Sequence, residues 1–394
     1  MALLKDLTVD GKGYYGIGAS AVNKKNDLYT YLRITDIRDD GTLNMNDLKS
    51  VDDSDADKYL LKPNDIVFAR TGASTGRNYF YDGSDGTFVY AGFLIKFSID
   101  PSKVNPLYVK YYCQSEQYRS WIYSFSAGST RGNINAQTLG SMAIPLPTRE
   151  QQDFLVNVLA PLDAKIKQNN KINDNLEQQA QAIYRERFER VPSEDLPSGW
   201  RVVALGDVAT ISNKSFNPLK EAEKMLEHYS IPAFDEARFP VFEPSTSIKS
   251  NKFVIDASSF MISKLNPTTK RVWKPYCLTE NAVCSTEFIV YKAKDESITD
   301  FLYSVIDSAS FSDFMCSHVT GSTGSRQRTT PSETLAYELT LPSEGDLAEF
   351  QSLVSPMYAQ MRINAIENDK LKRLRDSLLP KLMSGELDVS DVQL

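Results

Sequence analysis

Two segments of the chain carry apolar residues at alternating steps of four and three, the pattern typical of a coiled coil. The two stripes extend over residues 155–187 and 350–382, more than four heptads each. A helix of this kind buries its stripe against a partner helix, and the simplest partner for either segment is the other. The stripe positions are Leu155, Leu159, Leu162, Ile166, Asn169, Asn173, Leu176, Ala180, Ile183 and Arg187 in the first segment, and Phe350, Val354, Met357, Met361, Asn364, Asn368, Leu371, Arg375, Leu378 and Leu382 in the second.

The centre of each stripe is polar. Asn169 and Asn173 occupy the centre of the first stripe, and Asn364 and Asn368 that of the second. Antiparallel pairing would place Asn169 opposite Asn368 and Asn173 opposite Asn364, and a buried asparagine pair fixes helix register at some cost in stability. The alternative is two ordinary amphipathic helices, each packed on its own domain. We further expect Pro161 and Pro356 in the first turn of each long segment, where a missing N–H costs nothing.

The second half of the chain repeats landmarks of the first at a separation of about 195 residues, which predicts a tandem duplication. The polar segment 191–200 is the joint between the copies. The matching landmarks are Leu4–Leu7 with Leu205–Val208, Ile66–Arg70 with Phe260–Lys264, Phe93 and Tyr108 with Phe288 and Tyr303, Gly128-Ser129-Thr130 with Gly321-Ser322-Thr323, and Pro161 with Pro356.

Each half outside the long helices alternates short β-branched and aromatic runs with turns and one helix-like stretch. The strand-like runs are 66–68, 90–97, 253–255 and 287–291, and the helix-like stretches are 107–124 and 299–317. The predicted fold class is therefore α+β. We expect two globular domains, 1–148 and 191–343, separated by a central long helix in 149–190 and followed by a C-terminal long helix and tail in 344–394.

Composition places the chain among ordinary globular proteins, with 394 residues of which 41% are hydrophobic and 24% charged. The N-terminus has no apolar signal region and no run approaches the ~18 apolar residues of a membrane span, so we expect a cytoplasmic protein without membrane contact. Cys113, Cys277, Cys284 and Cys316, together with His228 and His318, show no metal-ligand spacing, so no metal site is expected.

Charge gives two opposite indications. The net charge of −7 disfavours non-specific nucleic-acid binding, which normally needs a basic field. Between residues 249 and 274, however, six basic residues stand against one acidic residue, a local net charge of +5. This segment is a candidate anion-facing patch, with a solvated charged face as the alternative. The basic residues are Lys249, Lys252, Lys264, Lys270, Arg271 and Lys274.

Four segments carry a family resemblance: EQQDFLVNVLAPLDAKIKQNNKINDNLEQQAQAIYRERF (150–188), LPSGWRVVALGDVATI (196–211), DIVFARTGASTG (65–76) and LLPKLMSGELDV (378–389). They resemble the specificity subunit of Type I restriction-modification enzymes, and the likeness spans essentially the whole chain. One departure is that the first half begins at Leu4 without its own Leu-Pro-x-Gly-Trp entry.

The resemblance implies two target-recognition domains, each reading one half of a split sequence in double-stranded DNA. The two antiparallel helices would set the unread spacer and dock two modification subunits, and ~28 residues of helix give ~43 Å, against ~34–36 Å for one turn of B-DNA. By the same resemblance the chain is non-catalytic and holds no cofactor. S-adenosylmethionine, ATP and Mg would belong to the modification subunits and to the restriction or translocase subunits.

Candidate DNA-facing residues follow from asking which features the two halves share. Shared features are expected to position phosphates, or to be plain turns, whereas divergent positions with Arg, Lys, Asn or Gln are expected to read bases. The shared set is Arg70, Ser129 and Thr130 with Lys264, Ser322 and Thr323. The divergent set is Arg77, Asn78, Arg131, Asn133 and Gln137 in the first half and Lys270, Arg271, Arg326, Gln327 and Arg328 in the second.

Three motifs favour other functions but fit them poorly. Gly11 to Gly16 has the spacing of a dinucleotide fingerprint, yet no buried strand precedes it and no long helix follows, so a loop is favoured. Asn105-Pro106-Leu107-Tyr108 resembles the adenine loop of N6-methyltransferases without the second proline, so a turn opening a helix is favoured. Asp163 lies on the first long helix and lacks an acidic counterpart in the repeat, which disfavours a nuclease metal site.

Two functional alternatives stay open beside the DNA-recognition subunit. One is a stand-alone scaffold whose two modules bind proteins or glycans, which predicts no strong dependence of DNA affinity on salt. The other is a fused methyltransferase, which predicts S-adenosylmethionine binding by the isolated chain.

Overall fold

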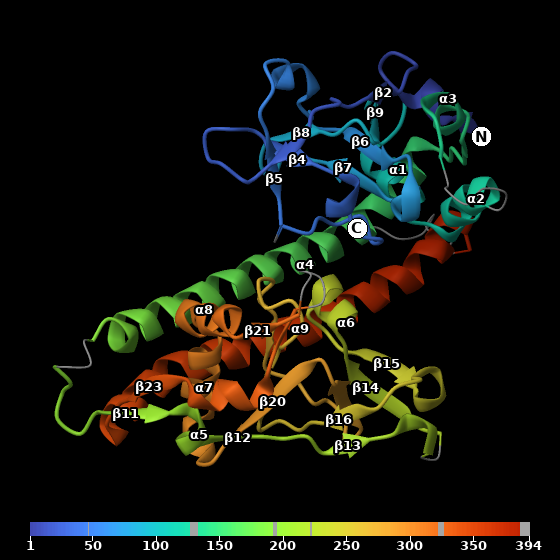
Figure 1. Ribbon diagram of the computed structural model, residues 1–394. Helices are drawn as coiled ribbons and strands as arrows, with labels where there is room; N and C mark the ends of the chain where they lie inside the picture. The colour runs from blue at the N-terminus through green and yellow to red at the C-terminus, as the bar shows by residue number, and fades with distance from the viewer. Residues whose placement is uncertain (46, 127–132, 192–194, 221–222, 322–326, 387–394) are drawn as a thin grey trace. The chain divides into compact units, whose positions relative to one another are not determined.

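The computed structural model describes residues 1–394 except 46, 127–132, 192–194, 221–222, 322–326 and 387–394 (Figure 1). The chain forms two compact units, one made of residues 1–165 and 371–394 (unit 1) and one of residues 166–370 (unit 2). The boundary between the units falls within both long helices, α4 (Arg149–Tyr184) and α9 (Glu344–Ser384). Among the described helices, none combines the length and the apolar composition that crossing a membrane requires.

Unit 1 is built from short strands and helices ahead of α4. The strands are β1 (Ala2–Leu3), β2 (Tyr14–Tyr15), β3 (Ala21–Val22), β4 (Thr30–Leu32), β5 (Lys49–Val51), β6 (Asp65–Ala69), β7 (Asn78–Tyr81), β8 (Phe88–Tyr90), β9 (Leu94–Ser98) and β10 (Ala143–Ile144). The helices are α1 (Pro106–Tyr112), α2 (Glu116–Ser126) and α3 (Ala136–Gly140), with 3-10 turns η1 (Leu4–Leu7), η2 (Ile34–Asp36), η3 (Ala56–Tyr59) and η4 (Gly72–Ser74).

The central sheet of unit 1 has the strand order β2-β9-β6-β7 (Figure 1), and its strand β6 is buried on both faces. Successive side chains of a strand point to opposite faces, so β6 supplies two different cores. Ile66 and Phe68 pack with α1 and with the ends of both long helices, whereas Val67 and Ala69 pack against the second sheet, β3-β5-β4-β8. A strand that is buried on both faces consists of a continuous run of apolar residues. The apolar run 66–68 therefore predicted β6.

Unit 2 repeats this plan with more strands. They are β11 (Arg201–Ala204), β12 (Ala209–Ile211), β13 (Ser215–Phe216), β14 (Met225–Tyr229), β15 (Val241–Pro244), β16 (Lys252–Val254), β17 (Ser259–Ser263), β18 (Val272–Trp273), β19 (Ala282–Ser285), β20 (Phe288–Ala293), β21 (Val319–Thr320), β22 (Arg328–Thr329) and β23 (Glu338–Leu341). The helices are α5 (Leu205–Val208), α6 (Ile231–Ala237), α7 (Thr299–Ile306) and α8 (Ala309–Ser317), with η6 (Pro218–Lys220), η7 (Ser245–Ser247), η8 (Glu296–Ile298), η10 (Pro331–Ala336) and a π-helical turn at Arg185–Glu189.

The central sheets of the two units have the same strand order. In unit 2 the order is β12-β20-β17-β18, and the register is also the same, since Asp65 pairs with Ser98 as Ser259 pairs with Lys292. The second sheets differ, because β5 pairs with β4 in unit 1 whereas the corresponding strand β16 pairs with β19 in unit 2. The sheet that packs against the helices is thus the common part, and the outer sheet is where the two units diverge.

Two expected helices and one expected strand are each divided in two. The stretch 107–124 forms α1 and α2, and 299–317 forms α7 and α8. A serine starts the second helix each time, because Ser115 Oγ accepts from Tyr118 N (3.2 Å) and Ser308 Oγ from Phe311 N (3.1 Å). The expected strand 90–97 is interrupted between Tyr90 and Leu94, since β8 and β9 belong to different sheets. Periodicity alone does not show such breaks.

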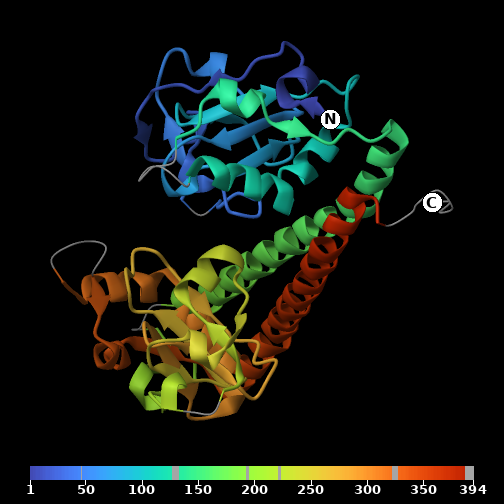
Figure 2. The same cartoon turned by 90° about the vertical axis from the view of Figure 1, so that its right-hand side faces the viewer.

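The long helices α4 and α9 pair antiparallel (Figure 2). Within unit 2, Asn169 Nδ2 donates to Asn368 Oδ1 (2.9 Å) and Asn364 Nδ2 to Asn173 Oδ1 (2.8 Å), which are the pairs that the antiparallel heptad alignment predicts. Asn169, Asn364 and Asn368 are buried. We call these four residues the asparagine layer. Among the described residues Asn169 Oδ1 finds no hydrogen-bond partner, so the layer fixes the register of the helices at a cost in stability.

The expected position of the two prolines was wrong. Helix α4 begins at Arg149 and α9 at Glu344, so Pro161 and Pro356 each lie twelve residues inside a helix. A proline at an interior position removes one backbone hydrogen bond. Leu155 and Leu159 on α4, and Phe350 and Val354 on α9, are buried in the two cores around these prolines. Packing of the apolar stripe against the cores therefore stabilises each helix enough to continue past its proline.

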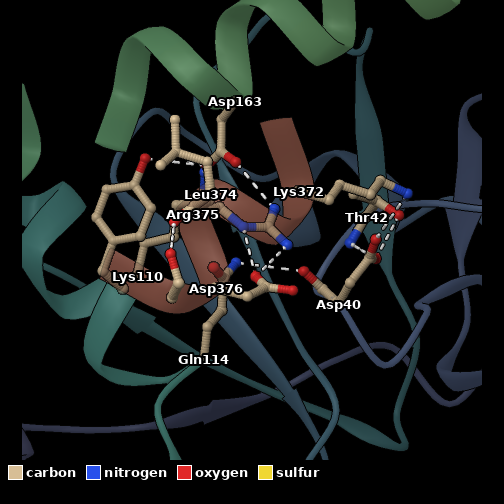
Figure 3. Close-up of polar contacts among 11 residues, drawn as sticks. Asp40, Thr42, Lys110, Gln114, Asp163, Lys372, Leu374, Arg375 and Asp376 are labelled. Carbon is tan, nitrogen blue, oxygen red and sulfur yellow. Dashed lines mark hydrogen bonds and ion pairs between the residues drawn. The ribbon is translucent and has the colours of Figure 1, made fainter. Parts of the chain in front are cut away.

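In unit 1 a buried ionic network joins α1 to both long helices (Figure 3). The Asp163 carboxylate accepts from Lys110 Nζ (2.6 Å), Tyr111 Oη (2.9 Å) and Arg375 Nη1 (3.0 Å). Burial raises the pKa of Asp163, but Lys110 and Arg375 outweigh it and hold this pKa below its ordinary value. Both oxygens are taken by donors on the protein, so Asp163 is a structural carboxylate rather than half of a metal site.

Replacing Asp163 by alanine should destabilise the protein strongly, because it leaves the largely buried Lys110 and Arg375 without their common counter-charge. We expect a loss of about 3–5 kcal/mol in the free energy of unfolding, measured by urea titration. Since the native pKa is lowered, the contribution of Asp163 is fully present above about pH 4 and is lost as the pH falls toward the native pKa. Asp376→Ala is the control, because this exposed carboxylate also binds Arg375 and should cost less than about 1 kcal/mol. Equal losses for the two variants would contradict the network.

Replacing one asparagine of a hydrogen-bonded pair should lower the free energy of unfolding more than replacing both. In Asn169→Leu, the Oδ1 atom of buried Asn368 loses the amide that donates to it, while its Nδ2 still donates to Asn170 Oδ1, with an expected cost of about 1–3 kcal/mol. The double variant Asn169→Leu, Asn368→Leu should recover most of this loss, because two leucines pack as an apolar pair. Asn175→Leu, an exposed change on the same helix, is the control and should change stability by less than about 0.5 kcal/mol. Additive effects in the double-mutant cycle would show that the pair does not couple.

Candidate nucleic-acid interface

Arg70 and Lys264 occupy the same backbone position, directly after β6 in unit 1 and after β17 in unit 2. Arg70 N donates to Phe93 O (3.0 Å), and Lys264 N donates to Glu287 O (2.9 Å). On the other side, Ile134 N donates to Arg70 O (2.9 Å) and Thr329 N to Lys264 O (3.1 Å). In both units, the residue that follows the central strand is therefore held by matching backbone hydrogen bonds on its two sides.

This register corrects one landmark of the repeat. The counterpart of Phe288 is Leu94, because Leu94 pairs with Ala69 as Phe288 pairs with Ser263. The sequence alignment had matched Phe288 with Phe93, one residue away, because both are aromatic. A shift of one residue along a strand moves a side chain to the other face. Leu94 is buried, whereas Phe93 is 59% exposed, and its structural counterpart is Glu287.

Asn133 and Arg328 are likewise structural counterparts. Asn133 forms a β-bridge with Thr71, and Arg328 forms one with Leu265, in each case beside the residue that follows the central strand. The expected DNA-facing residues Ser129, Thr130 and Arg131, and Ser322, Thr323 and Arg326, lie outside the described residues.

In unit 1 these contacts define a group that we call the Arg70 surface, in which Arg70 is half-buried and the other members are exposed: Tyr15, Arg70, Phe93, Asn133 and Gln137. The Arg70 guanidinium lies 5.0 Å from the centre of the Tyr15 ring, and Tyr15 Oη accepts from Ala136 N (3.1 Å) at the start of α3. Among the described residues Arg70 Nε has no hydrogen-bond partner. Asn133 and Gln137 are exposed. Aromatic faces beside a cation and two amides suit nucleic-acid contact.

In unit 2 the corresponding group, the Lys264 surface, consists of Lys264, Glu287, Gln327 and Arg328. Arg328 meets the Glu287 carboxylate with both Nε (3.0 Å) and Nη2 (3.1 Å), and this hydrogen-bonded anion holds the pKa of Arg328 above its ordinary value. Gln327 O accepts from Asn266 N (2.9 Å), which fixes the approach of the chain to Arg328. The two surfaces therefore share a backbone framework and differ in their side chains.

Arg77 and Arg271, expected at divergent positions, are structural counterparts with the same role. Ala69 N donates to Arg77 O (2.8 Å) and Ser263 N to Arg271 O (2.9 Å). Arg77 contacts Asp39 through Nε (2.7 Å) and Nη2 (3.1 Å). Arg271 contacts Asp235 in the same forked manner, at 2.6 and 2.9 Å. Both arginines tie the central sheet to a segment of the outer layer, so these two residues hold the same structural position in the two units.

Other expected residues also serve the fold. Asn78 is buried and donates to Cys113 O (2.9 Å). Lys270 pairs with buried Asp307 at 2.6 Å, and although burial raises the pKa of Asp307 to about 6, Lys270 acts in the opposite direction. Lys252 is buried and Lys274 pairs with Asp300. Arg271 is paired as well, so much of the positive charge of segment 249–274 is neutralised by acidic residues within unit 2. Of the basic residues in this segment, Lys264 lies on the candidate surface.

The competing motifs have structural explanations. A Cβ at Gly16 would lie 2.2 Å from Tyr90 O, and one at Gly13 would lie 2.5 Å from the Phe97 ring, so these glycines allow close packing around β2. Asn105 Oδ1 caps α1 by accepting from Leu107 N (3.0 Å), with Pro106 in the first turn. Among the described residues, no group of three or more His, Cys, Asp or Glu is placed to hold a metal ion.

Comparison with known proteins agrees with this arrangement. Residues 18–178 match the family described as Type I restriction modification DNA specificity domain. The Type I restriction enzyme MjaIX specificity subunit of Methanocaldococcus jannaschii is 25% identical over 72% of this chain and 70% of its own length. The Type I restriction enzyme HindI specificity subunit of Haemophilus influenzae is 21% identical over 84% of this chain and 88% of its own length.

The fold also has a solved counterpart. The S subunit of a Type I restriction-modification system from M. genitalium superposes with a TM-score of 0.54 at 16% identity, covering 96% of this chain and 94% of that one. At this identity the likeness concerns the fold, and the family profile and the named relatives supply the assignment. The chain is thus similar, over residues 18–178, to the Type I restriction modification DNA specificity domain and, over most of its length, to specificity subunits of Type I restriction enzymes.

Proposed function

We propose that this chain is the sequence-specific DNA-recognition subunit of a Type I restriction-modification complex and directs that complex to a bipartite target. The observation that carries the proposal is the pair of surfaces at Arg70 and Lys264. Their backbones are held by matching hydrogen bonds, yet the side chains that they expose differ. One framework with two sets of contact residues is what reading two different half-sites requires.

The division of labour along the chain follows from this. Residues 1–148 and 191–343 are two copies of one target-recognition domain, supported by the common strand order and register of their central sheets. The helical segments 149–190 and 344–394 set the unread spacer and dock two modification subunits. The antiparallel asparagine layer supports this part, because it fixes the register of α4 against α9.

The chain is proposed to be non-catalytic and to bind no cofactor of its own. Methyl transfer from S-adenosylmethionine, and ATP- and Mg-dependent translocation and cleavage, belong to the modification and restriction subunits, and the complex works in the cytoplasm. The net charge of −7 fits this role because the cations that meet DNA are confined to the domain surfaces and the partner subunits share the contact. The names of the relatives, all specificity subunits of Type I restriction enzymes, support this assignment.

Exchanging one domain tests the function directly. Residues 1–148 are replaced by the corresponding domain of another family member, and host DNA is sequenced for N6-methyladenine with the original chain, with the exchanged chain and without the gene. We expect a split motif that depends on the gene, of which the exchange alters one half only. The reciprocal exchange of residues 191–343 is the control and should alter the other half. A change in both halves after one exchange would contradict the modular assignment.

A further inference from the structure

The two positions that differ most between the surfaces are 93 and 133 in unit 1, and 287 and 328 in unit 2. Phe93 and Glu287 supply the carbonyls that accept from Arg70 N and Lys264 N, so they are counterparts. Asn133 and Arg328 form the counterpart bridges to Thr71 and Leu265. At two corresponding backbone positions, unit 1 therefore has Phe and Asn where unit 2 has Glu and Arg.

In unit 2 the side chains at these two positions meet, because Arg328 Nε and Glu287 Oε2 are 3.0 Å apart and Arg328 Nη2 and Glu287 Oε1 are 3.1 Å apart. In unit 1 the same backbone framework places Phe93 on one side of the Arg70–Thr71 segment and Asn133 on the other. Each domain thus presents a pair of side chains at corresponding positions, Phe93 with Asn133 or Glu287 with Arg328.

The chemistry of each pair matches one kind of base pair in the major groove. Phenylalanine contacts the thymine methyl group, and asparagine forms two hydrogen bonds with adenine, so Phe93 and Asn133 suit A·T. Arginine forms two hydrogen bonds with guanine, and glutamate accepts from the amino group of cytosine, so Arg328 and Glu287 suit G·C. In both domains the two side chains suit the two partners of a single base pair.

The ion pair in unit 2 is only partly buried. Its arginine side chain is 44% exposed and its glutamate side chain 29% exposed, and exposed ion pairs add little stability. Unit 1 keeps the same backbone framework with Phe and Asn at these positions. A carboxylate on a surface that meets phosphates is unfavourable unless it contacts a base, and Glu287 faces this cost unless it accepts from cytosine.

We propose that these two pairs are the corresponding base-reading positions of the two domains: Phe93 and Asn133 read an A·T pair in one half-site, and Glu287 and Arg328 read a G·C pair in the other. This assignment rests on the proposed DNA-recognition function. It adds Phe93 and Glu287 to the contact residues and gives Asn133 and Arg328 specific partners.

The test transplants one pair into the other domain. The double variant Phe93→Glu, Asn133→Arg, assembled with its modification subunits, is offered duplex libraries randomised in each half-site, and the bound sequences are counted. We expect one position of the half-site read by unit 1 to change from A·T to G·C preference by about tenfold or more, with the other half-site unchanged. The reciprocal variant Glu287→Phe, Arg328→Asn should change one position of the other half-site from G·C to A·T.

The control is Tyr29→Glu, which turns an exposed aromatic residue of unit 1 outside the Arg70 surface into a carboxylate and should leave every preference unchanged. Unchanged preferences in both transplants would overturn the assignment, and so would a uniform loss of affinity for all sequences, which indicates a backbone contact. If the original complex selects no split motif at all, the proposed function itself fails. Phe93, Asn133 and Arg328 are exposed and Glu287 is half-buried, and thermal unfolding midpoints equal to that of the original chain establish that the variants fold.

Discussion

The antiparallel pairing of α4 with α9 is the constraint on which both units depend. Neither unit completes its inner core without one end of each helix. In unit 1, Leu155 and Leu159 of α4 and Leu379 of α9 close the core under the central sheet. In unit 2, Tyr184 of α4 and Phe350 of α9 do the same. A register shift between the helices would therefore misplace side chains in both cores, and the buried asparagine layer makes such a shift costly.

The two units close their cores with different chemistry. Unit 1 joins its helices to α1 through charge, with Asp163 between Lys110 and Arg375. Unit 2 uses an aromatic cluster in which Phe188 lies 5.4 Å from Phe301 and 5.1 Å from Phe350, measured between ring centres. If the charged helix ends packed on unit 2, or the aromatic ends on unit 1, a charge would be buried without a partner. The chemistry of each helix end therefore specifies the domain against which it packs.

Sequence reasoning succeeded where a signal is periodic or local. The heptad stripes predicted both helices and the asparagine pairs, and the 194-residue shift placed Arg70 and Lys264 correctly. It failed where distant partners decide the outcome. The ion pairs of Arg77 with Asp39 and of Arg271 with Asp235 were not predicted, because nothing in the local sequence links these residues. The correspondence of Phe93 with Glu287 was not predicted either, because the repeat matched Phe93 with Phe288, and strand register corrects this match by one residue. Pro161 was placed at a helix start because local rules ignore the core that carries α4 through it.

The central claim is that the paired helices set the spacing of the split target. Inserting one heptad in α4 after Asn173 and one in α9 before Asn364 keeps the four-and-three spacing of both stripes and preserves the asparagine pairs. Seven residues lengthen each helix by about 10 Å, the length of about three base pairs. Sequencing of N6-methyladenine in host DNA should then show both half-sites unchanged and the unread spacer longer by about three base pairs. Methylation that keeps the original spacer would contradict the claim that the helices set it.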